Sequence, residues 1–247
     1  MQKAIIIIIY LLLYHVLPAQ SFKTTQQKYE RVKTAYNEKW ENLKTDLAKQ
    51  NINPLNFELF IRVFKKDKTV ELWIKSKEEK TFKLFKTYVI CSSSGELGPK
   101  RKQGDNQVPE GYYSISAFNP VSNYYLSLQV SYPNQSDIII GKNNLGGEIM
   151  IHGNCVTIGC IPLTDNYIKE VYILAVEAKS NGQENIPVYI YPTRLNESGI
   201  EFLKNNYSAN ISLISFWNNL KLGYDYFELH KRIPEISVDK NGKYIFN

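Results

Sequence analysis

The chain has 247 residues and a formal net charge of +6, with 43% hydrophobic and 22% charged residues. This composition is ordinary for a globular protein, and it excludes a disordered chain and a nucleic-acid-binding protein built on long charged blocks. The length suits one domain with additions or two small domains, and it is enough to bury a core without metal or disulfide support.

The first residues have the layout of a secretory signal peptide. Lys3 is followed by an apolar run over residues 4–16 and by Leu17-Pro18-Ala19, after which the sequence turns polar at Gln20. The run is short for a bilayer span, which needs about 20 residues. We expect a leader at 1–19, a periplasmic or extracytoplasmic location, and no stable membrane insertion after cleavage. An uncleaved anchor is the alternative.

Helical spacing comes next, followed by strand patterns. Apolar residues between positions 26 and 49 recur at steps of three and four, which predicts a helix that Asn53-Pro54 ends. Its expected role is to pack across a sheet, although a partner-binding helix is an alternative. Alternating and β-rich runs predict strands at 57–64, 69–76 and 82–91. Cys91 ends the third strand and is interpreted as a core residue.

A long loop separates these strands from the rest of the chain. Residues 92–111 are rich in Gly, Pro and charge, and long loops on a packed scaffold are often functional. Strand patterns return at 112–118, 125–132 and 147–152. Thr164 is a predicted N-cap for a helix over 165–179. A strand at 187–191, helices near 198–206 and 213–231, and a hairpin around Asn241-Gly242 complete the chain.

The segment that carries chemistry is 149–164, which reads I-M-I-H-G-N-C-V-T-I-G-C-I-P-L-T. Beyond the leader the chain has three cysteines, so one remains odd in an exported protein. Acyl transfer by cysteine needs a thiol, a nearby base and hydrogen-bond donors for the oxyanion. His152 and Cys160 supply the first two if the loop between them folds back, and Gly159 allows a tight turn there.

Other interpretations of the same residues stay open. Cys155 is close enough in sequence to Cys160 for a disulfide, and it also suits a structural role or a redox partner that silences Cys160. A zinc site on His152, Cys155 and Cys160 is conceivable, because catalytic zinc takes three protein ligands, but the spacing fits no usual pattern. His230 lies in a charged helical context and is interpreted as a surface residue.

The segment resembles the L,D-transpeptidase catalytic-domain family. The family's H-G element matches His152-Gly153, and its [S/T]-x-G-C element matches Thr157-Ile158-Gly159-Cys160. The murein transpeptidase-like branch, with its compact H-G-x-C-V-[ST]-I-G-C motif, is similar over more of the chain. The similar stretches are 84–115, 124–134, 146–160 and 216–228.

The resemblance implies an α+β, mainly β fold: an L,D-transpeptidase-type β-sandwich or mixed-sheet catalytic domain with added N-terminal and C-terminal helices. The expected division is a leader at 1–19, an N-terminal helix at 20–53, a catalytic domain at 54–195, and a helical extension with a hairpin at 196–247. It implies Cys160 as nucleophile and His152 as proton donor and acceptor. The Gly153 carbonyl would orient His152, and the Gly159 and Cys160 amides would hold the oxyanion.

The resemblance also implies a peptidoglycan peptide as substrate, with no cofactor, no metal and no nucleic-acid partner; substrate-binding residues are not identified. The sequence departs from the wider family where Ile158 replaces a frequent histidine and where Ile161-Pro162-Leu163 replaces an Arg or Asn after the nucleophile. These departures affect the acceptor side of the reaction. A hydrolase or amidase of the same fold that releases a wall-linked peptide or protein, a non-catalytic wall-binding module, and an adaptor using the 26–49 helix are therefore alternatives. Tyr124, Tyr125 and Tyr132 are interpreted either as cleft residues or as ordinary sheet packing.

Overall fold

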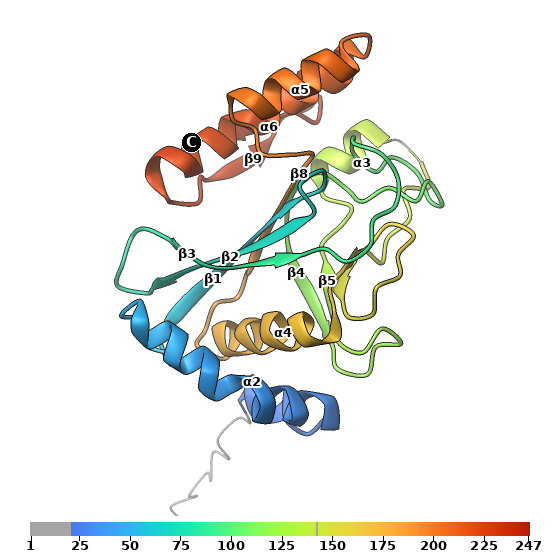
Figure 1. The fold of residues 1–247 in the computed structure, drawn as a ribbon. Coiled ribbons are helices and arrows are strands. Elements are labelled where there is room, and N and C mark those ends of the chain that lie inside the picture. The colour runs from blue at the N-terminus through green and yellow to red at the C-terminus, as the bar shows by residue number, and fades with distance from the viewer. Residues whose placement is uncertain (1–20, 142) are drawn as a thin grey trace, which may run out of the picture.

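The structure of the chain is a computed structural model that describes residues 21–141 and 143–247. The predicted leader lies outside the described residues. A sheet of eight strands forms the centre, in the order β3-β2-β1-β8-β4-β5-β6-β7, and helices cover both of its faces (Figure 1). The strands of this sheet are β1 (Phe57–Phe64), β2 (Thr69–Ser76), β3 (Lys83–Val89), β4 (Gly111–Asn119), β5 (Ser127–Val130), β6 (Met150–His152), β7 (Ile161–Pro162) and β8 (Pro187–Tyr191).

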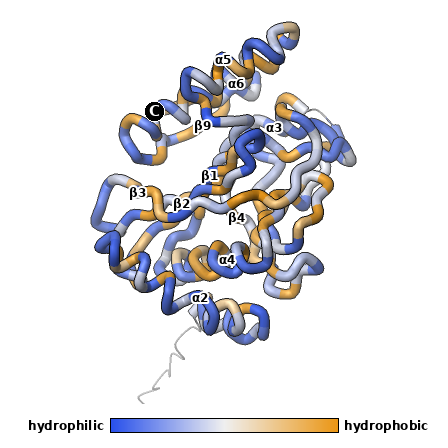
Figure 2. Tube along the Cα trace, in the orientation of Figure 1, coloured by the Kyte–Doolittle hydropathy of each residue, from blue (hydrophilic) through white to orange (hydrophobic). Residues whose placement is uncertain are grey.

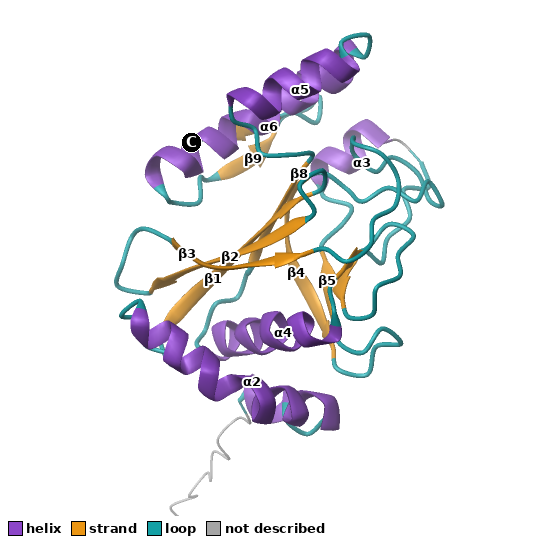
Figure 3. Ribbon diagram, in the orientation of Figure 1, coloured by secondary structure: helices purple, strands orange, loops and turns teal. Residues whose placement is uncertain are grey.

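The helices fall into two groups on opposite faces of the sheet, with one short helix beside the loops (Figure 3). One face carries α1 (Phe22–Gln26), α2 (Glu30–Lys49) and α4 (Asp165–Ser180), and the other carries α5 (Glu197–Tyr207), α6 (Ile211–His230) and the two-stranded sheet of β9 (Ile236–Val238) and β10 (Tyr244–Phe246). The remaining helix is α3 (Gln135–Gly141). The mixed α+β architecture that the resemblance implied is therefore confirmed.

Strand β1 explains why both faces are covered, because nearly all of its side chains are buried. Successive strand residues point to opposite faces. Leu59, Ile61 and Val63 accordingly pack in the core under α2 and α4, whereas Phe60 and Phe64 pack in the core under α6. A strand with two apolar faces is stable only between two layers, and the C-terminal helices supply the second layer.

Helix α4 lies between the sheet and α2 and is buried continuously from Val171 to Ala178. Figure 2 shows its long apolar stretch, in contrast to the mixed surface of α2. The Thr164 hydroxyl accepts a hydrogen bond from the Tyr167 amide at its start, as the sequence predicted, and Gly182 follows its end at a φ of +92°. Capping fixes where α4 begins, and therefore where the preceding motif residues lie.

One fully buried cation joins the C-terminal layer to the sheet. The Arg62 side chain is 1% exposed and donates to the Glu228 carboxylate of α6 at 2.7 Å. Its guanidinium also lies over the rings of Phe227 and Tyr224, at 4.9 and 5.0 Å from their centroids. A buried charge must be paired, so Arg62 fixes the position of α6 against β1.

The strand and helix predictions were accurate where periodicity was strong. Strands 57–64, 69–76 and 187–191 have the predicted bounds, and the hairpin around Asn241-Gly242 forms, with Gly242 at a φ of +82°. The predicted strand at 147–152 shortens to Met150–His152, and the sequence patterns did not predict α1, α3 or β7. Within the described residues, every helix is too short or too polar to cross a membrane.

Candidate active site

The pairing of two short parallel strands puts His152 and Cys160 on one face of the sheet. In β6 and β7, Ile151 pairs with Ile161 and His152 pairs with Pro162. Ile151 and Ile161 both face the core. Because side chains alternate along an extended chain, His152 lies on the opposite face, and so does Cys160, which immediately precedes β7. The fold-back of the loop that the sequence analysis required is therefore present.

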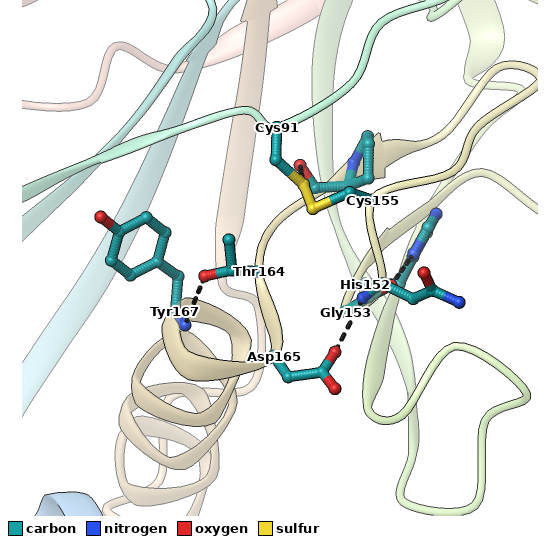
Figure 4. Close-up of a disulfide and its surroundings, with 9 residues drawn as sticks. Cys91, His152, Gly153, Cys155, Thr164, Asp165 and Tyr167 are labelled. Atoms are coloured by element: carbon teal, nitrogen blue, oxygen red, sulfur yellow. Dashed lines mark hydrogen bonds between the residues drawn. A yellow bond between two sulfur atoms is a disulfide. The ribbon is translucent and has the colours of Figure 1, made fainter.

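The His152 ring is buried, with 1% of the residue exposed, and is held from two sides. The carbonyl oxygen of Gly153 forms a hydrogen bond with Nδ1 (Figure 4). The ring of Tyr124 packs against the imidazole in a tilted arrangement, with 4.6 Å between the centroids. With Nδ1 donating to a carbonyl, the neutral imidazole carries its free lone pair on Nε2.

Gly153 is at a position where no side chain fits. A Cβ there would lie 2.6 Å from the Asp165 carboxylate and 2.9 Å from the Tyr124 carbonyl oxygen. That carboxylate is also fixed, because it accepts a hydrogen bond of 2.8 Å from the Asn154 amide (Figure 4). The start of α4 thus holds the chain that follows His152.

Cys160 carries a free, half-buried thiol. Its Sγ contacts the carbonyl oxygen of Glu148 at 3.6 Å, and no hydrogen bond joins it to His152 in the described part of the chain. Burial raises the pKa of the Cys160 thiol above its ordinary value, and burial lowers the pKa of His152 below its ordinary value. At neutral pH the resting pair is therefore a neutral thiol and a neutral imidazole.

Thr157 holds the turn before Cys160. Its hydroxyl oxygen accepts hydrogen bonds from the amides of Cys160 at 2.8 Å and Gly159 at 3.2 Å, and the hydroxyl donates to the Cys160 carbonyl oxygen at 2.9 Å. The Gly159 and Cys160 amides were expected to bind an oxyanion. In this structure both of them donate to the Thr157 hydroxyl oxygen instead. Gly159 adopts a φ of +134°, which L side chains rarely take, so the turn requires glycine.

The observed disulfide agrees with a structural role for Cys155, but it contradicts a Cys155–Cys160 bridge and an unbonded core thiol at Cys91. Cys155 forms a disulfide with Cys91, across a sequence separation of 64, and not with Cys160 (Figure 4). Cys91 is therefore a bridge residue and not an isolated core thiol. The bridge excludes Cys155 as a zinc ligand or as the redox partner of Cys160 in this state, because its sulfur is already bonded. The odd thiol that the cysteine count predicted is Cys160.

The Cys160 thiol borders a cleft of about 270 Å³. One wall is the start of the long loop, Ser92–Leu97, with Val108 from its end; the other includes the β1–β2 turn and Phe202 and Tyr207 of α5. Sequence reasoning did not identify this turn or α5 as part of the site, because they lie far from the motif in the chain.

The three tyrosines considered earlier have different surroundings. Tyr124 is the one that contacts His152. The Tyr125 ring lies beside the Arg31 guanidinium at 5.6 Å, and the buried Tyr132 hydroxyl donates to the Lys100 and Leu145 carbonyl oxygens. Packing therefore explains Tyr125 and Tyr132.

Comparison with known proteins identifies similar sequences. Residues 58–190 match the YkuD family model, which describes the L,D-transpeptidase catalytic domain. YafK of Escherichia coli strain K12, which bears a provisional L,D-transpeptidase name, is 38% identical over 189 residues, covering 76% of this chain and 73% of that protein. Its counterpart in strain O157:H7 matches equally.

Solved structures are similar at low identity. The helical cell shape determining protein Pgp2 from Campylobacter jejuni has a TM-score of 0.44 and 17% identity, covering 80% of each chain. Bd1075 of Bdellovibrio bacteriovorus has a TM-score of 0.39 and 18% identity, covering 65% of this chain and 57% of that chain.

Proposed function

The chain belongs to the L,D-transpeptidase catalytic-domain family, and on this premise we propose that it is an exported cysteine acyltransferase that acts on peptidoglycan stem peptides. The observation that carries the proposal is the pairing of β6 with β7. This register puts His152 and the free thiol of Cys160 on one face of the sheet, and Cys160 borders a cleft, which supports the proposal.

Catalysis begins from a neutral pair. The thiol leaves the Glu148 carbonyl oxygen by rotation about its side-chain bond and transfers its proton to Nε2 of His152 as the sulfur attacks the substrate carbonyl carbon. The carbon–nitrogen bond of the resulting tetrahedral adduct breaks, and the imidazolium returns the proton to the leaving amine. A thioester remains on Cys160, and His152 is neutral again.

A second nucleophile resolves the thioester. An incoming amine attacks the thioester carbonyl and forms a new peptide bond in transpeptidation, whereas water forms a carboxylate in hydrolysis. In both cases His152 accepts the proton of the nucleophile and the Cys160 sulfur leaves with a proton. The donor carbonyl that we propose is that of the L-centre of diaminopimelate, with D-alanine or another amine as leaving group.

The oxyanion of the adduct needs donors, and the Gly159 and Cys160 amides are the candidates. Both point at the Thr157 hydroxyl oxygen, so an oxyanion that replaces this oxygen would receive the same two hydrogen bonds. Thr157 is then the residue that keeps the two amides aligned before substrate arrives.

The alternatives make different products. A hydrolase or amidase of the same fold would release a wall-linked peptide or protein without forming a new link, which agrees with the absence of an Arg or Asn after Cys160. A non-catalytic wall-binding module would bind the peptide and form no thioester. Export rests on the leader sequence at 1–19, and comparing the amino terminus of the periplasmic protein with that of the whole-cell protein tests it directly.

The deciding experiment is incubation of the purified protein with defined muropeptides, followed by mass spectrometry of products and of the protein. Cys160→Ala and His152→Ala are the matched inactive variants, and His230→Ala is the control, since its imidazole lies on the opposite layer at the end of α6. New cross-links or exchanged D-amino acids identify transpeptidation, and a shortened peptide or released amine identifies hydrolysis. Binding without products or a Cys160 adduct would overturn the enzyme assignment.

A further inference from the structure

The cleft beside Cys160 has a cationic end that the catalytic steps do not use. The tight turn between β1 and β2 places Lys66 and Lys68 in its wall. The turn is held rigidly, because the Lys66 amide donates to the Pro192 carbonyl oxygen at 2.8 Å and the Lys68 carbonyl oxygen accepts from the Ile90 amide at 2.8 Å. The two lysines are therefore presented from a fixed backbone.

Nearby acids do not neutralise these two lysines. Lys65, the third lysine of the turn, is satisfied by the buried carboxylate of Glu110 at 2.9 Å. Asp67, between the two exposed lysines, accepts from the Thr193 hydroxyl at 2.7 Å and is not part of the cleft wall. Among residues 21–141 and 143–247, neither Lys66 nor Lys68 forms a salt bridge, and the Lys66 ammonium lies 4.3 Å from the centroid of the Phe202 ring.

The cleft wall formed by the long loop contributes a hydroxyl and a carboxylate in place of ammonium groups. The Ser94 hydroxyl oxygen is buried without a hydrogen-bond partner in the described protein. Glu96 also lines the cleft, and no salt bridge engages its carboxylate within the described ranges. A buried hydroxyl without a partner costs free energy that a polar ligand would recover.

We propose that this cleft binds a substrate side chain that ends as an amino acid, with a carboxylate and an ammonium on one carbon. Lys66 and Lys68 would bind the carboxylate, and Glu96 would bind the ammonium. The proposal rests on the proposed function, and there the matching group is the D-centre of diaminopimelate in the residue whose carbonyl Cys160 attacks. The cleft, at about 270 Å³, suits one side chain and not a whole muropeptide.

Two other carboxylates of a stem peptide could also bind Lys66 and Lys68, but they would bring no ammonium to Glu96. The terminal carboxylate of the leaving residue and the carboxylate of the glutamyl residue lack an ammonium on the same carbon in the linked peptide. Three peptides of one sequence separate the sources: one with diaminopimelate, one with its D-centre carboxylate amidated, and one with that D-centre amine acetylated.

The experiment measures kcat/KM for the three peptides with the wild-type protein and with the double variant Lys66→Gln/Lys68→Gln. We expect amidation to lower kcat/KM of the wild type by about 10- to 100-fold, the range for losing a hydrogen bond to a charged group. The double variant should process the unmodified peptide as slowly as the amidated one and should no longer distinguish them. Glu96→Gln should abolish discrimination against the acetylated peptide in the same way.

The double variant Lys33→Gln/Lys44→Gln is the matched control. It loses the same two positive charges from α2, on the other face of the sheet, and should keep the wild-type preference. Dissociation constants measured with Cys160→Ala test the subsite independently of turnover. If amidation changes neither kcat/KM nor affinity, the subsite proposal is wrong although the enzyme is active. If affinity follows the predicted order but no peptide is turned over, the subsite stands and the proposed function fails.

Discussion

Removing the Cys91–Cys155 disulfide should destabilise the protein by an amount set by the chain length that it closes. The bridge spans a sequence separation of 64 and ties the end of β3 to the loop that precedes Cys160. In the chain-entropy description, closing a loop of this length lowers the entropy of the unfolded chain by an amount equivalent to about 4 kcal/mol at 25 °C. For a protein of this size, that loss lowers Tm by about 10 °C.

The assay is urea unfolding of Cys91→Ala/Cys155→Ala beside the wild type, each with and without dithiothreitol. The double variant should match the reduced wild type and should not respond to dithiothreitol. Placing both proteins in a Cys160→Ala background keeps the free thiol from forming other disulfides. The slope of the unfolding transition checks that the two proteins expose similar surface on unfolding.

A thiol count under denaturing, non-reducing conditions completes the test. The wild type should label at one cysteine, Cys160, and at all three after reduction. Three labelled thiols without reduction, or equal stability of the double variant and the oxidised wild type, would refute the pairing or the entropic account of its effect.

Three further predictions concern the site and its support. Arg62→Met should lower the free energy of unfolding by about 1–2 kcal/mol in urea denaturation, because, among the ion pairs of the described residues, the buried Glu71 keeps only that with Arg194 and Glu228 only that with Lys231; no loss would mean that these remaining pairs are sufficient. Thr157→Val should lower kcat about 10-fold by removing the hydroxyl that aligns two amides, whereas Thr157→Ser should restore it; equal loss in both would assign the effect to packing. Alkylation of Cys160 by iodoacetamide should accelerate only at a pH above the ordinary pKa of a thiol, because burial raises the pKa of Cys160. The value of kcat/KM should fall only at a pH below the ordinary pKa of imidazole, where His152 takes a proton, because burial lowers the pKa of His152; alkylation that stays fast in acid would instead indicate a preformed thiolate–imidazolium pair.

Much of the fold could be predicted from local patterns because these patterns report on neighbours a few residues apart. The β-rich run at 57–64 and the alternation in 69–76 predicted two strands with the observed bounds, and Thr164 predicted the start of α4. The H-G and T-I-G-C elements selected His152 and Cys160 because so few imidazoles and thiols remain after the leader. The same patterns were weakest where elements are short, as in α3 and β7, since a few residues carry little periodicity.

The sequence by itself determined the two candidate reactive side chains, the long loop and the odd cysteine. Tertiary structure decided the rest, because it depends on which strands become neighbours. Only the sheet order brings Cys91 to Cys155 and places the β1–β2 turn, with Lys66 and Lys68, across a cleft from the loop beside Cys160. Residues that meet across such a sheet have no fixed sequence spacing, so periodicity cannot report their contact.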